Sequence, residues 1–410
     1  MRQIIAFCLL FILVYNPPLS FIPINLTYIV YIIGLLHFIF IRKFYISKSE
    51  TTIFICFLAT VIWGSFITII NGAYDFNMLG ISRFLTGILS SMAIVYCLRY
   101  NNTYRPIYCS ILEFIVIAAC IQGVIVLITF VCEPAKSLLL NMLSNMPSSE
   151  LTKIINLSIM RGIGWTYVQF ADFAVIQGFG LFSLIAIKFL NIKTDVKKYF
   201  GAILFLLIIS GVLIARTFFI LLLGAIIFYM YLQLIIHKKT FKLLLIFKII
   251  SICAILILII YQFALQLLSE DTFNWIFEAY NNFDTSGKFQ TDSTDELKQY
   301  WHFPSNVKTI LLGDGRFIDQ IKFNYAQSDS AYIIGLFYWG IIGNIIYYTF
   351  IFALYYRTRL LCNNKVMRAL IVVFFLTILL YNIKGIFSGL VYFCVFLESL
   401  IVHREINSKY

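Results

Sequence analysis

The chain has 410 residues, of which 61% are hydrophobic and only 12% are charged, and its mean hydropathy is +0.92. Soluble domains carry about 25% charged residues, so this composition excludes an ordinary water-soluble domain. The formal net charge is +12, which is high enough to raise the question of a nucleic-acid partner.

Runs of about 20 apolar residues, the length that crosses roughly 30 Å of hydrocarbon, recur along the whole chain. Backbone groups in lipid must bond to one another, so runs of this length are helices. We therefore predict an all-α, polytopic membrane bundle, one integral membrane domain over residues 1–410 with about 12 transmembrane helices. The expected spans lie near residues 3–20, 22–41, 52–70, 78–98, 107–131, 166–190, 199–214, 217–236, 243–265, 330–356, 367–383 and 385–402.

The first span follows Met1-Arg2 directly and has no small-residue cleavage site, so we expect no cleavable signal peptide. In the twelve-span arrangement, most basic residues fall on one side of the membrane. This is the positive-inside bias, and it predicts that both termini are cytoplasmic. The excess positive charge therefore orients the protein in a membrane, and we expect no nucleic-acid partner. The residues concerned are Arg42, Lys43, Lys48, Arg99, Arg105, Lys193, Lys197, Lys198, Lys238, Lys239, Lys242, Arg357, Arg359, Lys365, Arg368, Arg404 and Lys409.

Two larger loops face outward, residues 132–165 and residues 266–328. In the second loop, Phe273, Ile276, Phe277 and Tyr280 recur at helical spacing and predict one apolar helix face. A second short helix is expected around 293–301, because Ser293 and Glu296 fit a capping box and Pro304 follows. These helices are expected either to lie on the membrane–water interface or to form a small packed cap without membrane contact.

Ionisable groups within membrane spans are costly, so they are functional hypotheses by default. An arginine presents a planar fork that binds phosphate or carboxylate with two hydrogen bonds. Several arginines that converge at the outer leaflet would bind a diphosphate headgroup. The cations expected near the outer ends of spans are Arg83, Arg161, Arg216, Arg316 and Lys384. The nearby acids are Asp75, Asp172, Asp314, Asp319 and Asp329.

These charges also have structural interpretations. Arg83 lies about one turn inside a span and is expected to pair with Asp172 or another acid, unless it binds substrate. Arg216 occupies the short outer turn between two spans, and Arg316 follows the Gly-Asp-Gly turn at 313–315. For these two arginines we favour a functional role. Asp329 precedes the tenth span, where it acts either as a helix cap or as a general base beside a phosphate site.

Several kinds of chemistry have no counterpart in the sequence. There is no Walker loop, no GxGxxG, no GxSxG, no HExxH and no zinc-type Cys/His spacing. The nine cysteines include no CxxC pair and lie mostly in apolar runs, so we interpret them as small apolar side chains. There is no DxD motif, and the first external turn, "NPPLSFIP", has no acid. We therefore expect no cofactor and no metal, so that any glycosyl transfer would be metal-independent.

Four short stretches resemble the O-antigen polymerase family of Gram-negative bacteria. They are "NPPLSF" after the first span, "MRGIGWTYVQFADFAVIQGFG" entering the sixth, "ARTFFILLLG" at an outer turn, and "GDGRF…SDSAYIIGLFYWGIIG" entering the tenth. The resemblance in topology covers most of the chain, although the motifs are short and degenerate. It implies a multi-pass protein of the bacterial inner membrane whose loops 132–165 and 266–328 are periplasmic.

The resemblance also implies a reaction. Family members join lipid-linked repeat units by moving the growing glycan from undecaprenyl diphosphate onto the sugar of an incoming unit. Arg316, Arg216 and Arg161 would then hold the leaving diphosphate, and Asp329, Asp314 or Asp172 would accept the proton from the attacking hydroxyl. Arg83 and Lys384 are further expected substrate-binding residues. The expected partners are undecaprenyl-diphosphate-linked repeat units, together with a chain-length regulator and a flippase of the same pathway.

Two alternatives remain open. The first is a ligase of the same superfamily, which transfers the finished glycan to the lipid A core. As the resemblance implies, such ligases carry a His-Asn pair where this chain has Asp329-Ser330. The second alternative is a lipid-linked oligosaccharide flippase. A flippase would be expected to carry charges deep along a central cavity, whereas the charges here are expected at one rim.

Overall fold

The computed structural model contains α-helices, one π-helical turn and connecting segments, and no strand, in the part of the chain that it describes. That part is the whole chain except residues 20–24, 74, 76–80, 100–104, 145–147, 169, 238–268, 289, 292–293, 296–297, 300, 318–324, 387–388 and 408–410. The chain divides into two compact units. Unit 1 comprises Met1–Pro18, Ile22–Ala118 and Glu296–Tyr410, and unit 2 comprises Leu19–Phe21 and Ala119–Asp295.

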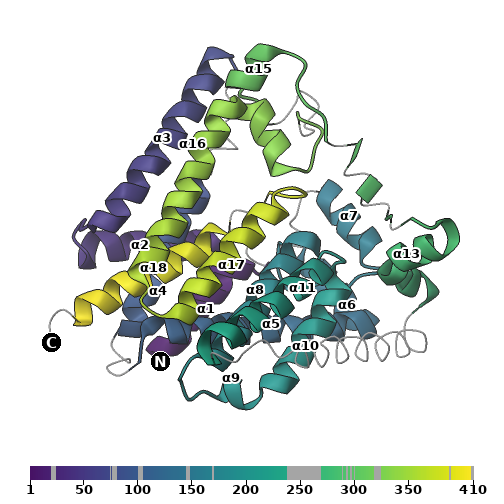
Figure 1. Ribbon diagram of the computed structural model, residues 1–410, viewed down its shortest axis with the longest axis horizontal. Helices are drawn as coiled ribbons and strands as arrows, with labels where there is room; N and C mark the ends of the chain where they lie inside the picture. The colour runs from purple at the N-terminus through teal and green to yellow at the C-terminus, as the bar shows by residue number, and fades with distance from the viewer. Residues whose placement is uncertain are drawn as a thin grey trace. The chain divides into compact units, whose positions relative to one another are not determined.

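Unit 1 holds the helices from both ends of the chain (Figure 1). They are α1 (Arg2–Tyr15), α2 (Leu26–Leu36), the π-turn η1 (His37–Ile41), α3 (Lys48–Ile70), α4 (Ile81–Arg99), the first part of α5 (Ile107–Val131), α15 (Val307–Leu312), α16 (Ala331–Leu361), α17 (Lys365–Tyr381) and α18 (Leu390–Asn407). Helix α4 packs against α1, α2 and α18, and α16 packs along α3. The core of this unit therefore forms around α4, where Ile88, Met92 and Val95 are buried.

Unit 2 is built around one fully enclosed helix. Its helices are the rest of α5, α6 (Glu133–Met142), α7 (Ser148–Leu157), α8 (Phe170–Phe189), α9 (Asp195–Lys198), α10 (Phe200–Ile214), α11 (Phe218–His237) and α13 (Glu270–Ser286). Every residue of α8 from Phe173 to Ile187 is buried, and α8 packs against α10 and α11. A helix that is apolar on all sides is stable only when it is enclosed in this way.

Helices coincide with eleven of the twelve expected spans, and the ninth, residues 243–265, lies outside the described residues. By length and composition, four of the helices in the described part of the chain are apolar enough to cross a membrane: α3, α5, α8 and α16. Helix α3 also exposes large apolar side chains along its length, among them Ile55, Ile62 and Ile69. These features are consistent with a helical membrane protein. The number of twelve spans and their orientation stay predictions.

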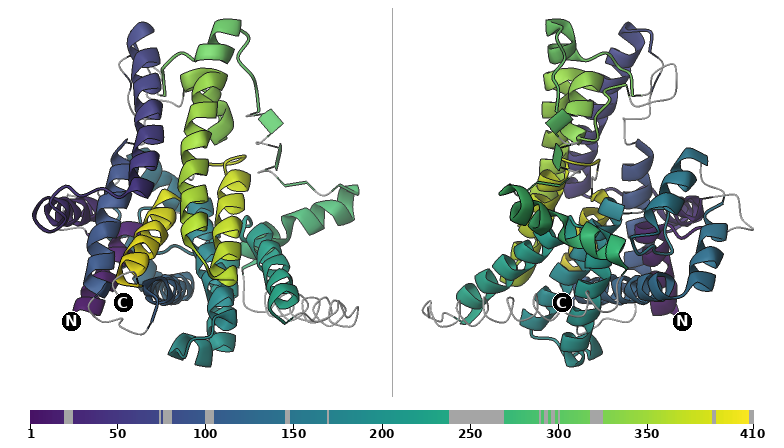
Figure 2. Two further views of the ribbon diagram at one scale, coloured as in Figure 1. Left: turned by 60° about the vertical axis from the view of Figure 1, so that its left-hand side comes forward. Right: turned by 90° about the vertical axis from the view of Figure 1, so that its right-hand side faces the viewer.

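Helix α16 is broken at Gly340, where φ is 67° and ψ is −173°. Its two arms, residues 331–339 and 341–361, fold back on each other, so that the rings of Tyr332 and Tyr348 stack with their centroids 5.1 Å apart. In a straight helix these two residues would be separated by about 24 Å. Residues 330–356 were expected to form one straight span, whereas in the structure they belong to a helical hairpin (Figures 1 and 2). The second arm alone is about 31 Å long, which still matches a bilayer core.

Gly340 suits this reversal for two reasons. Its positive φ is accessible to glycine at little cost, and a Cβ at this position would overlap the carbonyl group of Leu311. The neighbouring α15 packs against α16, so the segment that precedes α16 and the hairpin form one packed structure. The short helix α15 was not among the expected elements, nor were α6 and α7 in the loop 132–165.

A buried charge cluster ties three segments of unit 1 together. Arg42, which follows η1, is ion-paired with Glu50 at 2.6 Å and with Glu398 of α18 at 3.2 Å. Both carboxylate side chains are almost fully buried. Burial lowers the pKa of Arg42, but the charges of Glu398 and Glu50 more than offset this, so its pKa is raised. Arg42 therefore stays charged and forms ion pairs with both acids in the protein interior.

Candidate functional site

Arg216 lies in the tight turn between α10 and α11, as the sequence analysis predicted. The turn is closed by the Phe219 amide, which donates to the Arg216 carbonyl at 3.0 Å. Ala215 and Phe218 on either side are buried, while the Arg216 side chain is 17% exposed. The turn therefore anchors the backbone of Arg216 and leaves its guanidinium partly accessible.

The segment that follows Arg161, residues 162–165, is held in place partly by hydrogen bonds with buried polar side chains of α5. Gln122 donates to the Trp165 carbonyl at 2.8 Å and accepts from the Trp165 amide at 2.9 Å. Thr129 donates to the Ile163 carbonyl at 2.8 Å. The Gly162 amide, next to Arg161, donates to the Leu213 carbonyl near the end of α10 at 2.9 Å. This irregular segment of unit 2 is thus fixed to two helices, which restricts where the Arg161 side chain can reach.

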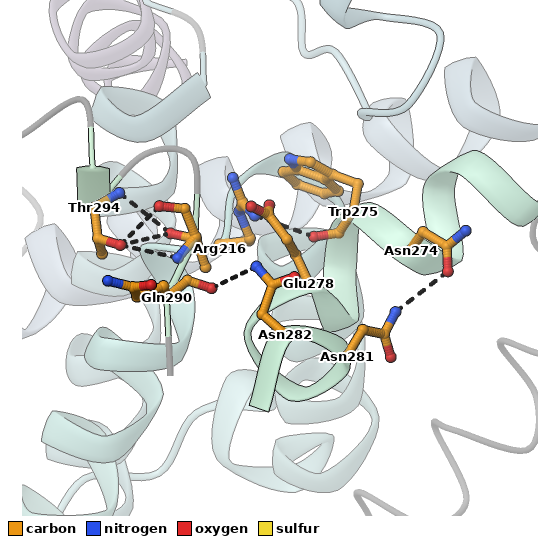
Figure 3. A network of polar contacts seen from close by, with 9 residues as sticks. Arg216, Asn274, Trp275, Glu278, Asn281, Asn282, Gln290 and Thr294 are labelled. Carbon is orange, nitrogen blue, oxygen red and sulfur yellow. Dashed lines mark hydrogen bonds and ion pairs between the residues drawn. The ribbon is translucent and has the colours of Figure 1, made fainter. Parts of the chain in front are cut away.

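The two arginines meet at one indole ring, that of Trp275 on α13. The guanidinium carbon of Arg161 lies 4.7 Å from the Trp275 ring centroid, and that of Arg216 lies 5.5 Å from it. Arg216 is also ion-paired with Glu278, one turn further along the same helix, and approaches the Trp275 carbonyl at 3.5 Å (Figure 3). The faces of a tryptophan ring attract cations, which accounts for two like charges at one side chain.

Helix α13 confirms the first predicted helix of the loop 266–328. Its N-cap is Ser269, whose hydroxyl accepts from the Thr272 amide, and it ends at Gly287 with φ of 69°. Within the predicted apolar face, Ile276 is buried while Tyr280 is 55% exposed. The Asn282 side chain then binds the Gln290 carbonyl at 2.9 Å, which returns the chain along the helix (Figure 3).

The second predicted helix falls partly outside the described residues, including both members of its capping box, Ser293 and Glu296. Residues 294–295 and 298–299 are helical. For both predicted helices of this loop, the expected position on the membrane–water interface stays a prediction.

Trp275 and Glu278 were not among the predicted site residues. The apolar stripe that predicts α13 runs along other positions, namely Phe273, Ile276, Phe277 and Tyr280. One signal was present: a tryptophan and an acid three residues apart lie on one face of a helix. Nothing in the sequence, however, connects that face with an arginine 59 residues earlier.

Two further polar groups near these arginines have unused hydrogen-bonding capacity. The indole nitrogen Nε1 of Trp275 and the hydroxyl of Thr217, the residue after Arg216, are both buried without a hydrogen-bond partner among the described residues. Buried polar atoms are normally satisfied, so such atoms call for an explanation. An oxygen-rich anion would supply acceptors for both.

Asp172 lies in the first turn of α8, two residues after Phe170, whose ring is 5.2 Å from the Arg161 guanidinium carbon. Asp172 is half-buried. Arg161, Arg216 and Asp172 all belong to unit 2, whereas Arg83, Asp314, Arg316, Asp329 and Lys384 belong to unit 1. Arg83 is exposed on α4 and makes no ion pair with another described residue of unit 1.

In unit 1, the Gly-Asp-Gly turn docks against the tip of the α16 hairpin. The amides of Asp314 and Gly315 donate to the carbonyls of Phe337 and Tyr338, both at 2.8 Å. Gly315 lies so close to α3 that a Cβ there would come within 2.7 Å of the Thr68 Cα. The side chain of Arg316, the next residue, is exposed. The turn thus carries Arg316 on a rigid support.

Asp314 is engaged within the loop. Its carboxylate accepts from the Thr309 hydroxyl at 2.9 Å and from the Tyr325 hydroxyl at 3.2 Å. Burial and the Asp314 charge raise the pKa of Tyr325, so its hydroxyl remains a donor well above neutral pH. Asp314 is therefore better suited to holding the loop than to taking up a substrate proton.

Asp329 and Lys384 come from two chain segments that are hydrogen-bonded to each other. The N-cap of α16 is Ser330, and its side chain makes no capping bond. Instead the Ser330 hydroxyl and the Ala331 amide both donate to the Asn382 carbonyl, at 3.3 Å and 3.0 Å. Asp329 is exposed and makes no hydrogen bond or ion pair with the residues that the structure describes. Of the three acids expected as a base, it is the one in unit 1 that is not occupied by the fold.

No protein-family model matches the chain, and neither a curated protein nor a solved structure shows a significant match to it.

The chemistry of these groups favours anion binding. In unit 2, the guanidiniums of Arg161 and Arg216 lie over the Trp275 ring, and Arg216 is ion-paired with Glu278. The indole N–H of Trp275 and the hydroxyl of Thr217 have no hydrogen-bond partner among the described residues. In unit 1, an exposed guanidinium follows a rigid turn. Guanidinium groups and neutral N–H or O–H donors together are the set that binds phosphate oxygens.

Proposed function

We propose that the chain is a membrane glycosyltransferase that polymerises undecaprenyl-diphosphate-linked oligosaccharide units into O-antigen on the periplasmic face of the inner membrane. The observation that carries the proposal is the meeting of Arg161 and Arg216 at Trp275. The resemblance of the four sequence stretches supplies the reaction, and two of those stretches contain these arginines.

In the proposed reaction, glycosyl transfer leaves a diphosphate with increased negative charge. Arg161 and Arg216 offset that charge, and the N–H of Trp275 and the hydroxyl of Thr217 add neutral donors. Stabilisation of a developing charge by preformed donors is often the largest single contribution to catalysis. Donor and acceptor both carry a diphosphate, so the reaction needs more than one phosphate-binding place. Arg316 is one of the exposed cations of unit 1, and it follows a turn that is hydrogen-bonded to the tip of the α16 hairpin.

The attacking sugar hydroxyl must lose a proton to a base within hydrogen-bond reach. In unit 2, which carries Arg161 and Arg216, Asp172 is the acid that we propose for this role. Asp329 is an exposed acid of unit 1 that no described residue engages. No metal is part of the proposal, since guanidinium groups provide the positive charge that a metal would otherwise supply.

The proposal is tested by complementing a strain that lacks the gene with variants of the chain. Arg161→Ala and Arg216→Ala are expected to abolish the long polysaccharide ladder while protein levels stay normal. A matched control is Arg359→Ala, because Arg359 is exposed and makes no ion pair with a described residue. A normal ladder from both site variants would refute the proposal.

A further inference from the structure

The tip of the α16 hairpin leaves backbone carbonyls that a continuous helix would satisfy. In an α-helix, the carbonyls of residues 337, 338 and 339 would accept from the amides four residues later. Here they accept instead from Asp314 N, Gly315 N and the Trp63 indole Nε1, at 2.8, 2.8 and 3.1 Å. Three donors from two other segments thus replace the missing helical bonds. An unsatisfied carbonyl in an apolar environment is costly, so the tip depends on these donors.

Asp75 secures the same turn from the other side. Its carboxylate oxygen Oδ2 accepts from the amide of Phe317 at 2.8 Å, and Phe317 directly follows Arg316. Its backbone carbonyl accepts from the Tyr338 hydroxyl at 2.5 Å and from the Thr68 hydroxyl at 3.4 Å. The side chain and the backbone of one residue therefore bind the loop and the hairpin tip.

The segment that carries Arg316 is consequently held at both ends. On its N-terminal side, Asp314 and Gly315 are bonded to the hairpin tip. On its C-terminal side, Phe317 is bonded to Asp75. Arg316 itself makes no hydrogen bond or ion pair with a described residue. Its side chain is thus exposed on a backbone that is fixed at both ends, and none of the described residues engages it, which is the arrangement that a preorganised binding group needs.

We infer that Asp75 is a positioning residue, which holds the backbone of residues 314–317 against the α16 hairpin and thereby orients Arg316. The expected effect of Asp75 on polymer formation rests on the proposed function. The hydrogen bond from Phe317 to Asp75 is a structural claim that is measured separately.

The test uses the purified full-length chain and two replacements of Asp75. Asp75→Asn keeps an oxygen that accepts from the Phe317 amide, whereas Asp75→Ala removes the acceptor. Losing one such bond is expected to speed hydrogen exchange in peptides covering residues 314–317 about tenfold in Asp75→Ala. Asp75→Asn is expected to exchange as the unsubstituted chain does. Asp284→Ala is the matched control, because Asp284 is an exposed acid that makes no contact of this kind with a described residue.

The same variants are then assayed for polymer formation with lipid-linked repeat units. Asp75→Ala is expected to lose most activity, and Asp75→Asn to retain most of it. Unchanged exchange in Asp75→Ala overturns the inference, as does equal loss of activity in both variants, which would show that the charge of Asp75 matters and not its hydrogen bond. If Arg316→Ala leaves polymer formation intact, the proposed function fails, and the exchange measurement alone decides the role of Asp75.

Discussion

Replacing Glu278 with glutamine is expected to strengthen the binding of a diphosphate to unit 2. In the structure, the carboxylate of Glu278 is paired with the Arg216 guanidinium, and each side chain is only 17% exposed. An incoming diphosphate must therefore compete with a resident carboxylate for the same cation. Glutamine has nearly the same shape but no charge, so it removes the resident negative charge that competes with the ligand for Arg216.

The size of the effect follows from the burial of this pair. Exposed ion pairs contribute about 0–1 kcal/mol, and removing one partner of a fully buried pair costs about 3–5 kcal/mol. A pair at 17% exposure lies between these limits. Removing the charge of Glu278 is therefore expected to improve the free energy of diphosphate binding by about 1–2 kcal/mol. This corresponds to a dissociation constant about 5–30-fold lower in Glu278→Gln.

The assay titrates the purified chain in detergent with undecaprenyl diphosphate and follows tryptophan fluorescence, to which Trp275 contributes. Glu133→Gln is the matched control, since Glu133 forms an ion pair with Lys136 in the same unit but is 76% exposed. The control is expected to change affinity less than about twofold, as exposed pairs contribute little. Weaker or unchanged binding by Glu278→Gln would refute the argument that Glu278 competes with the diphosphate.

Four further outcomes are expected. Arg316→Ala abolishes polymerisation at normal protein level and Arg316→Lys rescues it only partly, because lysine lacks the two-pronged geometry; a full-length ladder from Arg316→Ala contradicts this. Purified protein polymerises lipid-linked units in EDTA, and complete loss restored by Mg²⁺ or Mn²⁺ argues against the metal-free scheme. A strain without the gene keeps lipid A core capped with one repeat unit, visible on a silver-stained gel; bare core with accumulated lipid-linked polymer identifies a ligase instead. Arg42→Ala lowers the stability of unit 1 by about 3–5 kcal/mol, because two buried carboxylates lose their cation, and unchanged thermal unfolding of the purified variant speaks against that role.

Patterns of neighbouring residues in the sequence predicted most of the helices. Apolar runs of membrane length coincide with helices at α3, α5 and α8 because the backbone of such a run has no alternative partner in lipid. The turn at Arg216 followed from the basic pairs that flank the two runs, Lys197-Lys198 before them and Lys238-Lys239 after them. Helix α13 followed from apolar residues at helical spacing. In each case the determining interactions lie within a few residues along the chain.

The hairpin of α16 was not predictable in this way. The stretch from Ala331 to Tyr356 contains no charged residue and is mostly apolar, and a glycine at position 340 is equally compatible with close packing of a straight helix. What reverses the chain there is the supply of donors from Asp314, Gly315 and Trp63, which replace the lost helical bonds. Those donors come from segments that the sequence does not mark as neighbours.

The sequence by itself therefore determined the all-helical character of the chain, the position of most helices and the identity of the arginines worth testing. Only the tertiary structure decided which groups these arginines meet. Glu278 and Trp275 reach Arg216 across about 60 residues, and Asp75 reaches Phe317 across 242. Helix formation depends on hydrogen bonds between residues four apart, whereas the pairing of charges depends on how distant segments pack, and packing is a property of the whole fold.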